Sequence, residues 1–315
     1  MKKILLVFTG GTICTSSEDG VRSLATDSAK HKITENFAKS KTEFSELSDK
    51  IFETASPLNI LSENMDKQSL GKLIGFFKAA ELEKYSGVIV LHGTDTLAYS
   101  CAMISLLFGN SPVPIVFVSA NAPLDNPASN GNDNFAFAVG QILGGNLKSG
   151  GVFAAYKNIS DGTMHLHKGY RIMQSENFSE DFKSADVPKP KDAKLTQRLG
   201  EITAEILYIT PYVGINYGSY NLKDVDAVLH GTYHSGTLES NSFSEFAKRC
   251  AAENIPVYIV TCKSADDETY GSSEKLKSEN IIFLNDITAE TAYCRLLAAY
   301  SVFGGKEAEK AVLNM

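Results

Sequence analysis

Short apolar runs recur along this chain at intervals typical of strands that alternate with helices. Each run is rich in valine, isoleucine, leucine or phenylalanine and is too short for a helix, so we expect a buried strand at each one. The runs are Ile4–Phe8, Gly87–Leu91, Ile115–Val118, Val152–Ala155, Glu205–Thr210, Asp226–Leu229 and Pro256–Thr261.

Segments with a helical period lie between these runs. Within Asp66–Lys84 the apolar residues follow i, i+3, i+4, i+7 spacing, which predicts an amphipathic helix. Further helices are expected after Thr96 and over Asn134–Leu143, Ser242–Glu253 and Ala289–Phe303. Strands that alternate with helices favour βαβ units and a mainly parallel sheet covered on both faces.

The stretch Ser179–Arg198 interrupts this alternation. It holds two prolines, several lysines and no sustained apolar period, which is typical of a surface linker. We therefore expect an α/β protein with a larger N-terminal parallel-sheet domain over residues 1–185, a linker over 186–203 and a smaller C-terminal α/β domain over 204–315.

The composition narrows the classes of partner and compartment. A net charge of −7 argues against attraction to nucleic acid or to anionic membranes. No stretch approaches the roughly 18 to 20 apolar residues that cross a bilayer, and the first apolar run is too short for a signal peptide. The five cysteines are scattered and fit reduced thiols, so we expect a cytoplasmic protein.

Candidate chemistry lies where the predicted strands end, because ligands of open parallel sheets bind beyond the carboxyl ends of the strands. The loops there are Thr9–Ile13, His92–Thr96 and Ser119–Pro123, and two of them carry glycine followed by threonine. A glycine turn exposes backbone N–H groups, and a threonine hydroxyl can act as a nucleophile if a base removes its proton. The simpler interpretation is that Thr12 caps the next element, and one such loop alone would favour it.

Several familiar sites are excluded by their motifs. The chain has no phosphate-binding P-loop, no G-x-S-x-G elbow and no H-E-x-x-H zinc motif. His165 and His167 are more typical of neighbours on one strand face than of a metal site, so we expect no metal. A hydroxyl nucleophile without a histidine base needs another proton acceptor, and a buried neutral lysine linked through a second hydroxyl would serve. Thr94, Asp95 and Lys168 are the candidates, although spacing alone does not separate Lys168 from a solvated surface lysine.

Two loops together resemble a known family. Thr9–Ile13 and His92–Thr96 resemble the two signature motifs of bacterial-type L-asparaginases, in the family's order and at about its separation. Further similar segments run along almost the whole chain, at Ser62–Met65, Val118–Pro123, Asn130–Asn134 and Asp286–Leu296.

The resemblance implies a reaction and a set of residues. It implies conversion of L-asparagine to L-aspartate and ammonia through a threonine acyl-enzyme, with some glutaminase side activity and without a cofactor. Thr12 would be the nucleophile, and Thr94, Asp95 and Lys168 would form the activating group. The substrate would be bound by Ser62, Glu63 and the backbone around Gly11, Gly93 and Ala120. The family also implies a homodimer or homotetramer whose sites are completed across a subunit contact.

One departure from the family concerns a tyrosine. The family carries it on a mobile loop after the first motif, but Cys14–Lys30 contains none, and Val21 stands where it is expected. This polar segment is still expected to be a mobile lid. Tyr270 is the candidate that would supply an auxiliary hydroxyl instead, with a surface tyrosine as the simpler interpretation.

Two other functions stay open on the sequence. One is the asparaginase-like subunit of the archaeal glutamyl-tRNA amidotransferase, which would carry an added N-terminal domain, whereas the first strand here begins at Ile4. The other is a non-catalytic sensor of an acidic amino acid built on the same scaffold.

Overall fold

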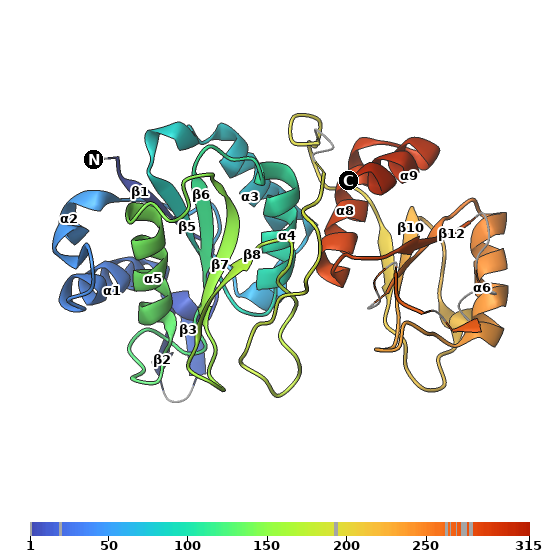
Figure 1. Ribbon diagram of the computed structural model, residues 1–315, viewed down its shortest axis with the longest axis horizontal. Helices are drawn as coiled ribbons and strands as arrows, with labels where there is room; N and C mark the ends of the chain where they lie inside the picture. Colours follow the sequence, from blue (N-terminus) through green and yellow to red (C-terminus); the bar gives the residue numbers. More distant parts are fainter. Residues whose placement is uncertain are drawn as a thin grey trace. The chain divides into compact units, whose positions relative to one another are not determined.

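The chain folds as two compact α/β units, Met1–Ser184 and Ala185–Met315, and each is described by itself (Figure 1). The computed structural model describes residues 2–18, 21–191, 195–261, 264, 266–268, 270–271, 276 and 280–315. The α/β class with a large, mainly parallel sheet is confirmed.

The first unit is built on a six-stranded sheet in the order β4-β1-β5-β6-β7-β8. All neighbouring strands are parallel except β8, which runs antiparallel to β7. Every residue of β1, β5 and β6 is buried, which explains their continuous apolar sequences. The strands are β1 (Ile4–Phe8), β4 (Phe52–Ala55), β5 (Gly87–Leu91), β6 (Pro114–Val118), β7 (Gly151–Lys157) and β8 (Met164–Lys168).

Helices cover both faces of this sheet, with α1 and α5 on one side and α3 and α4 on the other (Figure 1). A cluster of phenylalanines packs α1 and α5 against β4: the ring centroids of Phe37, Phe52 and Phe135 lie 5.5 to 5.8 Å apart. The helices of this unit are α1 (Thr26–Lys39), α2 (Ser48–Ile51), α3 (Lys67–Ala79), α4 (Leu97–Phe108) and α5 (Gly131–Leu143), with short 3-10 turns at Thr12–Cys14, Ser45–Leu47, Ser62–Asn64 and Leu82–Lys84.

The second unit has a four-stranded parallel sheet in the order β12-β11-β10-β9. Its core is rich in aromatic residues, and Tyr217 packs against Phe243 and Phe246 of α6. The elements are β9 (Ile206–Ile209), β10 (Ala227–Gly231), β11 (Val257–Val260), β12 (Ile281–Leu284), α6 (Ser240–Ala252), α8 (Ala289–Val302) and α9 (Gly305–Asn314), with a 3-10 turn at Tyr217–Ser219.

Some elements were not predicted from the sequence. They include the edge strands β4 and β12, the helices α1, α2 and α9, and a hairpin of β2 (Thr15–Glu18) and β3 (Val21–Leu24). The helix predicted over Asp66–Lys84 is shorter: Asp66 caps α3 by accepting from the Ser69 amide, and the helix ends at Ala79. None of the helices in the described part of the chain is both long and apolar enough to span a bilayer.

The same tetrapeptide, Leu-His-Gly-Thr, lies at the carboxyl end of β5 and of β10. His92 and His230 are buried, and the Nδ1 atom of each bonds to the carbonyl oxygen of the glycine that follows. Burial lowers the pKa of each imidazole to about 4. Both histidines are therefore neutral in the folded protein at neutral pH.

We expect Phe135→Ala to lower the free energy of unfolding by about 3–5 kcal/mol, because it empties a fully buried site between the rings of Phe37 and Phe52. Phe178→Ala is the matched control, since that ring is exposed, and its effect should stay within about 0.5 kcal/mol. Urea denaturation measures both, and equal losses would contradict the described core.

We expect the free energy of unfolding to fall as the pH drops from about 6.5 toward 4. His92 and His230 have an ordinary pKa in the unfolded state and take up protons in this range. Burial keeps both imidazoles neutral in the folded state, so protonation favours unfolding. His230→Gln should reduce the drop between pH 7.5 and pH 5 in urea titrations, and the exposed control His234→Gln should not. An unchanged drop in His230→Gln would contradict a neutral buried His230.

Candidate active site

Two glycines from different strands meet at the carboxyl edge of the first sheet. Gly11 follows β1 and has φ +74°, and Gly93 follows β5. A Cβ atom on Gly11 would lie 2.1 Å from the Gly93 Cα, and one on Gly93 would lie 2.3 Å from the Ser62 Oγ. Only glycine fits these positions. We call this contact of Gly11, Gly93 and Ser62 the glycine junction.

Backbone hydrogen bonds hold the first loop at this junction. The Thr9 amide and hydroxyl both donate to the Leu91 carbonyl, at 3.0 and 2.9 Å, and the Gly11 amide donates to the Ile60 carbonyl at 2.9 Å. Thr12 begins the following 3-10 turn and is half-buried, and its carbonyl accepts from the Thr15 hydroxyl at 2.7 Å. The fold thus places Thr12 one residue beyond the junction.

The second loop is fixed to Ser62 by two side-chain bonds. The Ser62 hydroxyl donates to the Asp95 carboxylate at 2.8 Å, and the Thr96 hydroxyl donates to the Ser62 carbonyl at 2.9 Å. Ser62 is buried, whereas Glu63 is exposed on the same 3-10 turn. Thr94 follows Gly93 directly and is half-buried, so Thr12 and Thr94 each adjoin one of the touching glycines.

The third loop, after β6, is tied to the second. The Ser119 hydroxyl donates to the His92 carbonyl at 2.6 Å, and the Ser119 carbonyl accepts from Asn134 of α5 at 2.9 Å. Ala120 is fully buried, and a Cβ on Gly131 would approach its side chain to 2.8 Å. Ala120 therefore packs against the start of α5, and any contact it made to a ligand would come from its backbone.

A depression of about 310 Å³ opens beside Thr94 and Asp95. Its far wall is the segment from Gln174 to Glu180, and Gln174 donates from its carboxamide to the Asp95 carbonyl. Tyr156, at the end of β7, also lines it, and burial raises the pKa of its hydroxyl to about 12. The described lining contains no lysine or histidine, and it does not include Thr12.

Lys168 is the last residue of β8, and its part in a relay with Thr94 and Asp95 stays a prediction. After β7 the chain turns and returns as the antiparallel β8, whose last residue, Lys168, pairs with Phe153. Strand β8 lies three strands from β5, or roughly 14 Å at the usual spacing. Lys168 is exposed there, and a Cβ on the next residue, Gly169, would lie 3.0 Å from the carbonyl oxygen of Cys101 in α4, the helix that follows Thr94 and Asp95.

Two further sequence predictions stay untested. The predicted lid Cys14–Lys30 comprises the β2–β3 hairpin and the first turn of α1, and its residues 19 and 20 lie outside the described part. Tyr270 belongs to the second unit and is 59% exposed, between stretches that are not described. Its auxiliary role stays a prediction.

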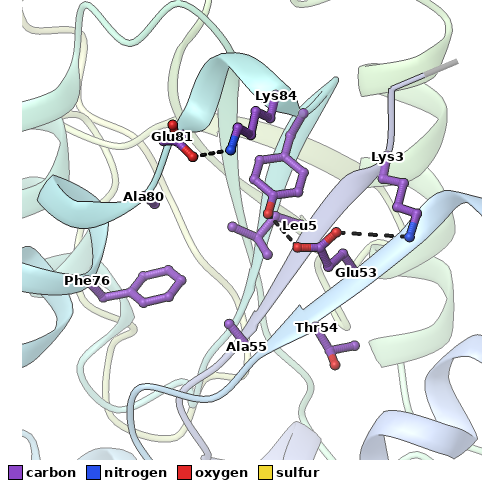
Figure 2. Close-up of a pocket in the computed structure, with 10 residues that line it drawn as sticks. Lys3, Leu5, Glu53, Thr54, Ala55, Phe76, Ala80, Glu81 and Lys84 are labelled. Atoms are coloured by element: carbon purple, nitrogen blue, oxygen red, sulfur yellow. Dashed lines mark hydrogen bonds and ion pairs between the residues drawn. The ribbon is translucent and has the colours of Figure 1, made fainter.

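A larger depression, of about 530 Å³, lies beside β4 at the amino end of the sheet (Figure 2). Its charged side chains already pair with one another: Lys84 with Glu81, Tyr85 with Glu53 at 2.6 Å, and Lys3 with Glu53 at 4.0 Å. These pairs leave it poorly suited to acyl transfer. Nowhere in the described residues do three histidine, cysteine or carboxylate side chains gather as they would around a metal ion.

Sequence reasoning missed Gln174 and Tyr156. The strand-end rule could have found Tyr156, because β7 also ends at this edge of the sheet. Gln174 lies in an irregular polar segment without any periodic signal. Only the folded chain brings it to Asp95.

Known proteins resemble this chain both in sequence and in fold. The chain is similar to a subunit of the glutamyl-tRNA(Gln) amidotransferase of Thermoplasma volcanium, with 26% identity over 79% of this chain and 66% of that protein. The chain therefore spans about two thirds of that relative's length. Solved structures share the fold: L-asparaginase I of Vibrio cholerae has 22% identity, a TM-score of 0.75 and coverage of 100% and 97% of the two chains.

The thermostable L-asparaginase of Thermococcus kodakarensis is also similar, with 21% identity, a TM-score of 0.74 and coverage of 98% of this chain and 96% of that one. The family described as "Asparaginase, N-terminal" matches residues 3–196, which include the glycine junction, Thr12, Thr94 and the wall at Gln174. With more than half of its length matched, the chain belongs to the asparaginase family.

Proposed function

We propose that this chain hydrolyses L-asparagine to L-aspartate and ammonia through an acyl-enzyme on Thr12. The glycine junction carries this proposal, because it sets two threonines beside one floor of backbone next to a depression of small-molecule size. In the first step the Thr12 oxygen attacks the side-chain amide carbon, the C–N bond breaks and ammonia leaves with the transferred proton. Water then hydrolyses the ester and releases aspartate.

The remaining roles follow from the contacts around the junction. Asp95 and the exposed Glu63 are the carboxylates near Ser62, and they suit the α-amino group of the substrate. The Gly11 amide already donates to Ile60, so the developing oxyanion must be bound by other N–H groups of these loops. No cofactor enters this scheme.

We further propose that the enzyme is a cytoplasmic homodimer or homotetramer. It would act on a small-molecule substrate and bind neither nucleic acid nor a membrane. Reduced, buried Cys14 and Cys250 suit that compartment, and burial raises the pKa of the Cys14 thiol to about 12, so it is unreactive. Sedimentation of the purified protein tests the oligomeric state.

A second candidate function is that of an amidotransferase subunit, because the curated relatives bear that name at 26% identity. Release of ammonia from asparagine by the purified chain alone, without tRNA or another protein, favours the first function. Activity that appears only with charged tRNA and a partner subunit favours the second. Tight binding of aspartate without turnover would instead indicate a sensor.

Thr12→Ala should lower kcat by at least about a thousandfold, because the acyl-enzyme cannot form without the hydroxyl. Thr94→Ala should have nearly the same effect. The thermal midpoint should stay within a few degrees in both, since neither side chain belongs to the core. Thr163→Ala, on the exposed β7–β8 turn, is the matched control; near-normal turnover in Thr12→Ala would exclude Thr12 as the nucleophile.

Glu63→Gln should raise KM for asparagine about tenfold with little change in kcat, because the lost charge acts on substrate capture. Glu83→Gln, an equally conservative change at the opposite edge of the sheet, should leave both constants alone. Steady-state kinetics with ammonia detection decides this, and an unaltered kcat/KM in Glu63→Gln would remove Glu63 from the site.

A further inference from the structure

The depression beside Thr94 and Asp95 extends beyond the residues that the proposed function assigns to asparagine. Its described lining includes neither Thr12 nor the substrate-binding candidates Ser62 and Glu63. At about 310 Å³ it is large enough to hold a small ligand group of its own. Its lining therefore indicates which chemical group would fit beside the second loop.

Carboxylates make up much of the polar part of this lining. They belong to Asp95, Glu176 and Glu180. Asp95 accepts from the Ser62 hydroxyl at 2.8 Å, and Glu176 pairs with Lys183 at 2.9 Å. Glu180 is exposed, and in the part of the chain that the structure describes no cation pairs with it. Its carboxylate is thus available to a cationic ligand.

A buried hydroxyl also belongs to the lining. Tyr156 is fully buried, and none of the described residues makes a hydrogen bond to its hydroxyl. Asn130 lies near, but its Nδ2 atom donates to the Lys157 carbonyl at 2.7 Å. Burial raises the pKa of the Tyr156 hydroxyl to about 12, and the nearby Glu180 carboxylate acts in the same direction. This neutral hydroxyl is the kind of buried polar group that a ligand would satisfy.

Aromatic rings complete the lining. The Tyr156 ring packs edge-on against Phe182, with centroids 4.8 Å apart. Phe178 lies on a turn closed by the Ser179 amide, which donates to the Glu176 carbonyl at 3.0 Å. Its φ of +62° is unfavourable for a bulky residue, and its ring is fully exposed, so the fold gains no packing from it. The ring is free to cover a ligand.

Carboxylates and aromatic rings together favour an organic cation. An ammonium or guanidinium group donates charge-assisted hydrogen bonds to carboxylates, and the faces of aromatic rings attract the same charge. The alkyl part of such a ligand would pack against the rings. An anion would meet like charges here, and a purely apolar group would leave the buried Tyr156 hydroxyl without a partner.

We propose that the depression beside Thr94 and Asp95 is a binding site for an organic cation with an alkyl part. The cation has two conceivable sources, the tail of an aspartyl amide longer than asparagine and a free amine. The first source rests on the proposed function, which sets Thr94 beside the amide. The Thr12 oxygen then attacks the amide carbon, the C–N bond breaks, and the amine leaves with the transferred proton. Water hydrolyses the ester to aspartate.

Calorimetry with diaminobutane tests the site itself, and butanediol is the uncharged probe. Wild type is compared with Glu180→Gln and Phe178→Ala, and Glu43→Gln, an exposed position of the same unit, is the matched control. We expect diaminobutane to bind and butanediol not to bind. The affinity for diaminobutane should fall about tenfold in Glu180→Gln and about threefold in Phe178→Ala, and should not change in Glu43→Gln.

Steady-state kinetics distinguish the two sources. The substrates are the aminobutyl amide of aspartate and the uncharged pentyl amide, which has the same length. If the cation is a substrate tail, kcat/KM should be about tenfold higher for the aminobutyl amide, and Glu180→Gln should abolish this preference without changing kcat/KM for asparagine. Equal turnover of the two amides, with diaminobutane binding that depends on Glu180, identifies the cation as a free amine.

Two results overturn the site, and one separates it from the proposed function. Absence of saturable diaminobutane binding, together with equal turnover of the two amides, overturns it. An equal loss of affinity in Glu43→Gln and Glu180→Gln also overturns it, because the net charge of −7 would then explain the attraction. If Glu180→Gln does not fold, unchanged affinity in Phe178→Ala has the same meaning. Diaminobutane binding that depends on Glu180 in a protein that hydrolyses no amide supports the site and rejects the acyl-enzyme function.

Discussion

The contact between Gly11 and Gly93 is the constraint on which the rest of the site depends. A Cβ on Gly11 would come within 2.1 Å of the Gly93 Cα, so the two loops are closer than any side chain allows. The contact follows from the pairing of β1 with β5, whose parallel register brings Phe8 opposite Leu91 and so ends both strands at one level. This register sets the positions of Thr12 and Thr94. The parallel bridge between Gly10 and Ile60 brings the segment with Ser62 to the same contact.

Side chains, in contrast, form the walls of the depression beside Thr94 and Asp95. Asp95 is held by Ser62 from one side and by Gln174 from the other, and Tyr156 closes the end of β7 against Phe182, with ring centroids 4.8 Å apart. The described lining of the depression carries carboxylates and hydroxyls, among them Asp95, Glu176 and Tyr156. The glycine junction is therefore fixed by backbone contacts, whereas the lining of the depression is fixed by side-chain contacts.

Sequence reasoning succeeded where burial leaves a simple signature. β1 and β5 have the predicted bounds because both faces of each strand are covered, which produces an unbroken apolar run. The edge strand β4 was missed because two of its four residues are exposed, so its sequence, Phe-Glu-Thr-Ala, carries neither an apolar run nor a clear alternation.

The candidate catalytic loops could be located for a geometric reason, since parallel strands bring their carboxyl ends to one edge. The rest of the site could not be predicted, for a different reason. Lys168 was chosen by its place along the chain, and strand pairing alone, which sets it opposite Phe153, does not decide its role. No local pattern marks Gln174, because its contact with Asp95 joins residues 79 positions apart and depends on the path of an irregular segment.

The glycine junction, a contact made mostly of backbone, limits which substitutions the protein can accept. Two of the three groups that meet at the junction are glycines without room for a Cβ, so point mutation can alter the floor only by breaking it. The wall from Gln174 to Glu180 is irregular and partly exposed, and it can accept new side chains at little cost to the fold. Substitutions that change the shape or the charge of the depression can therefore accumulate in this wall, while the glycine junction stays as it is.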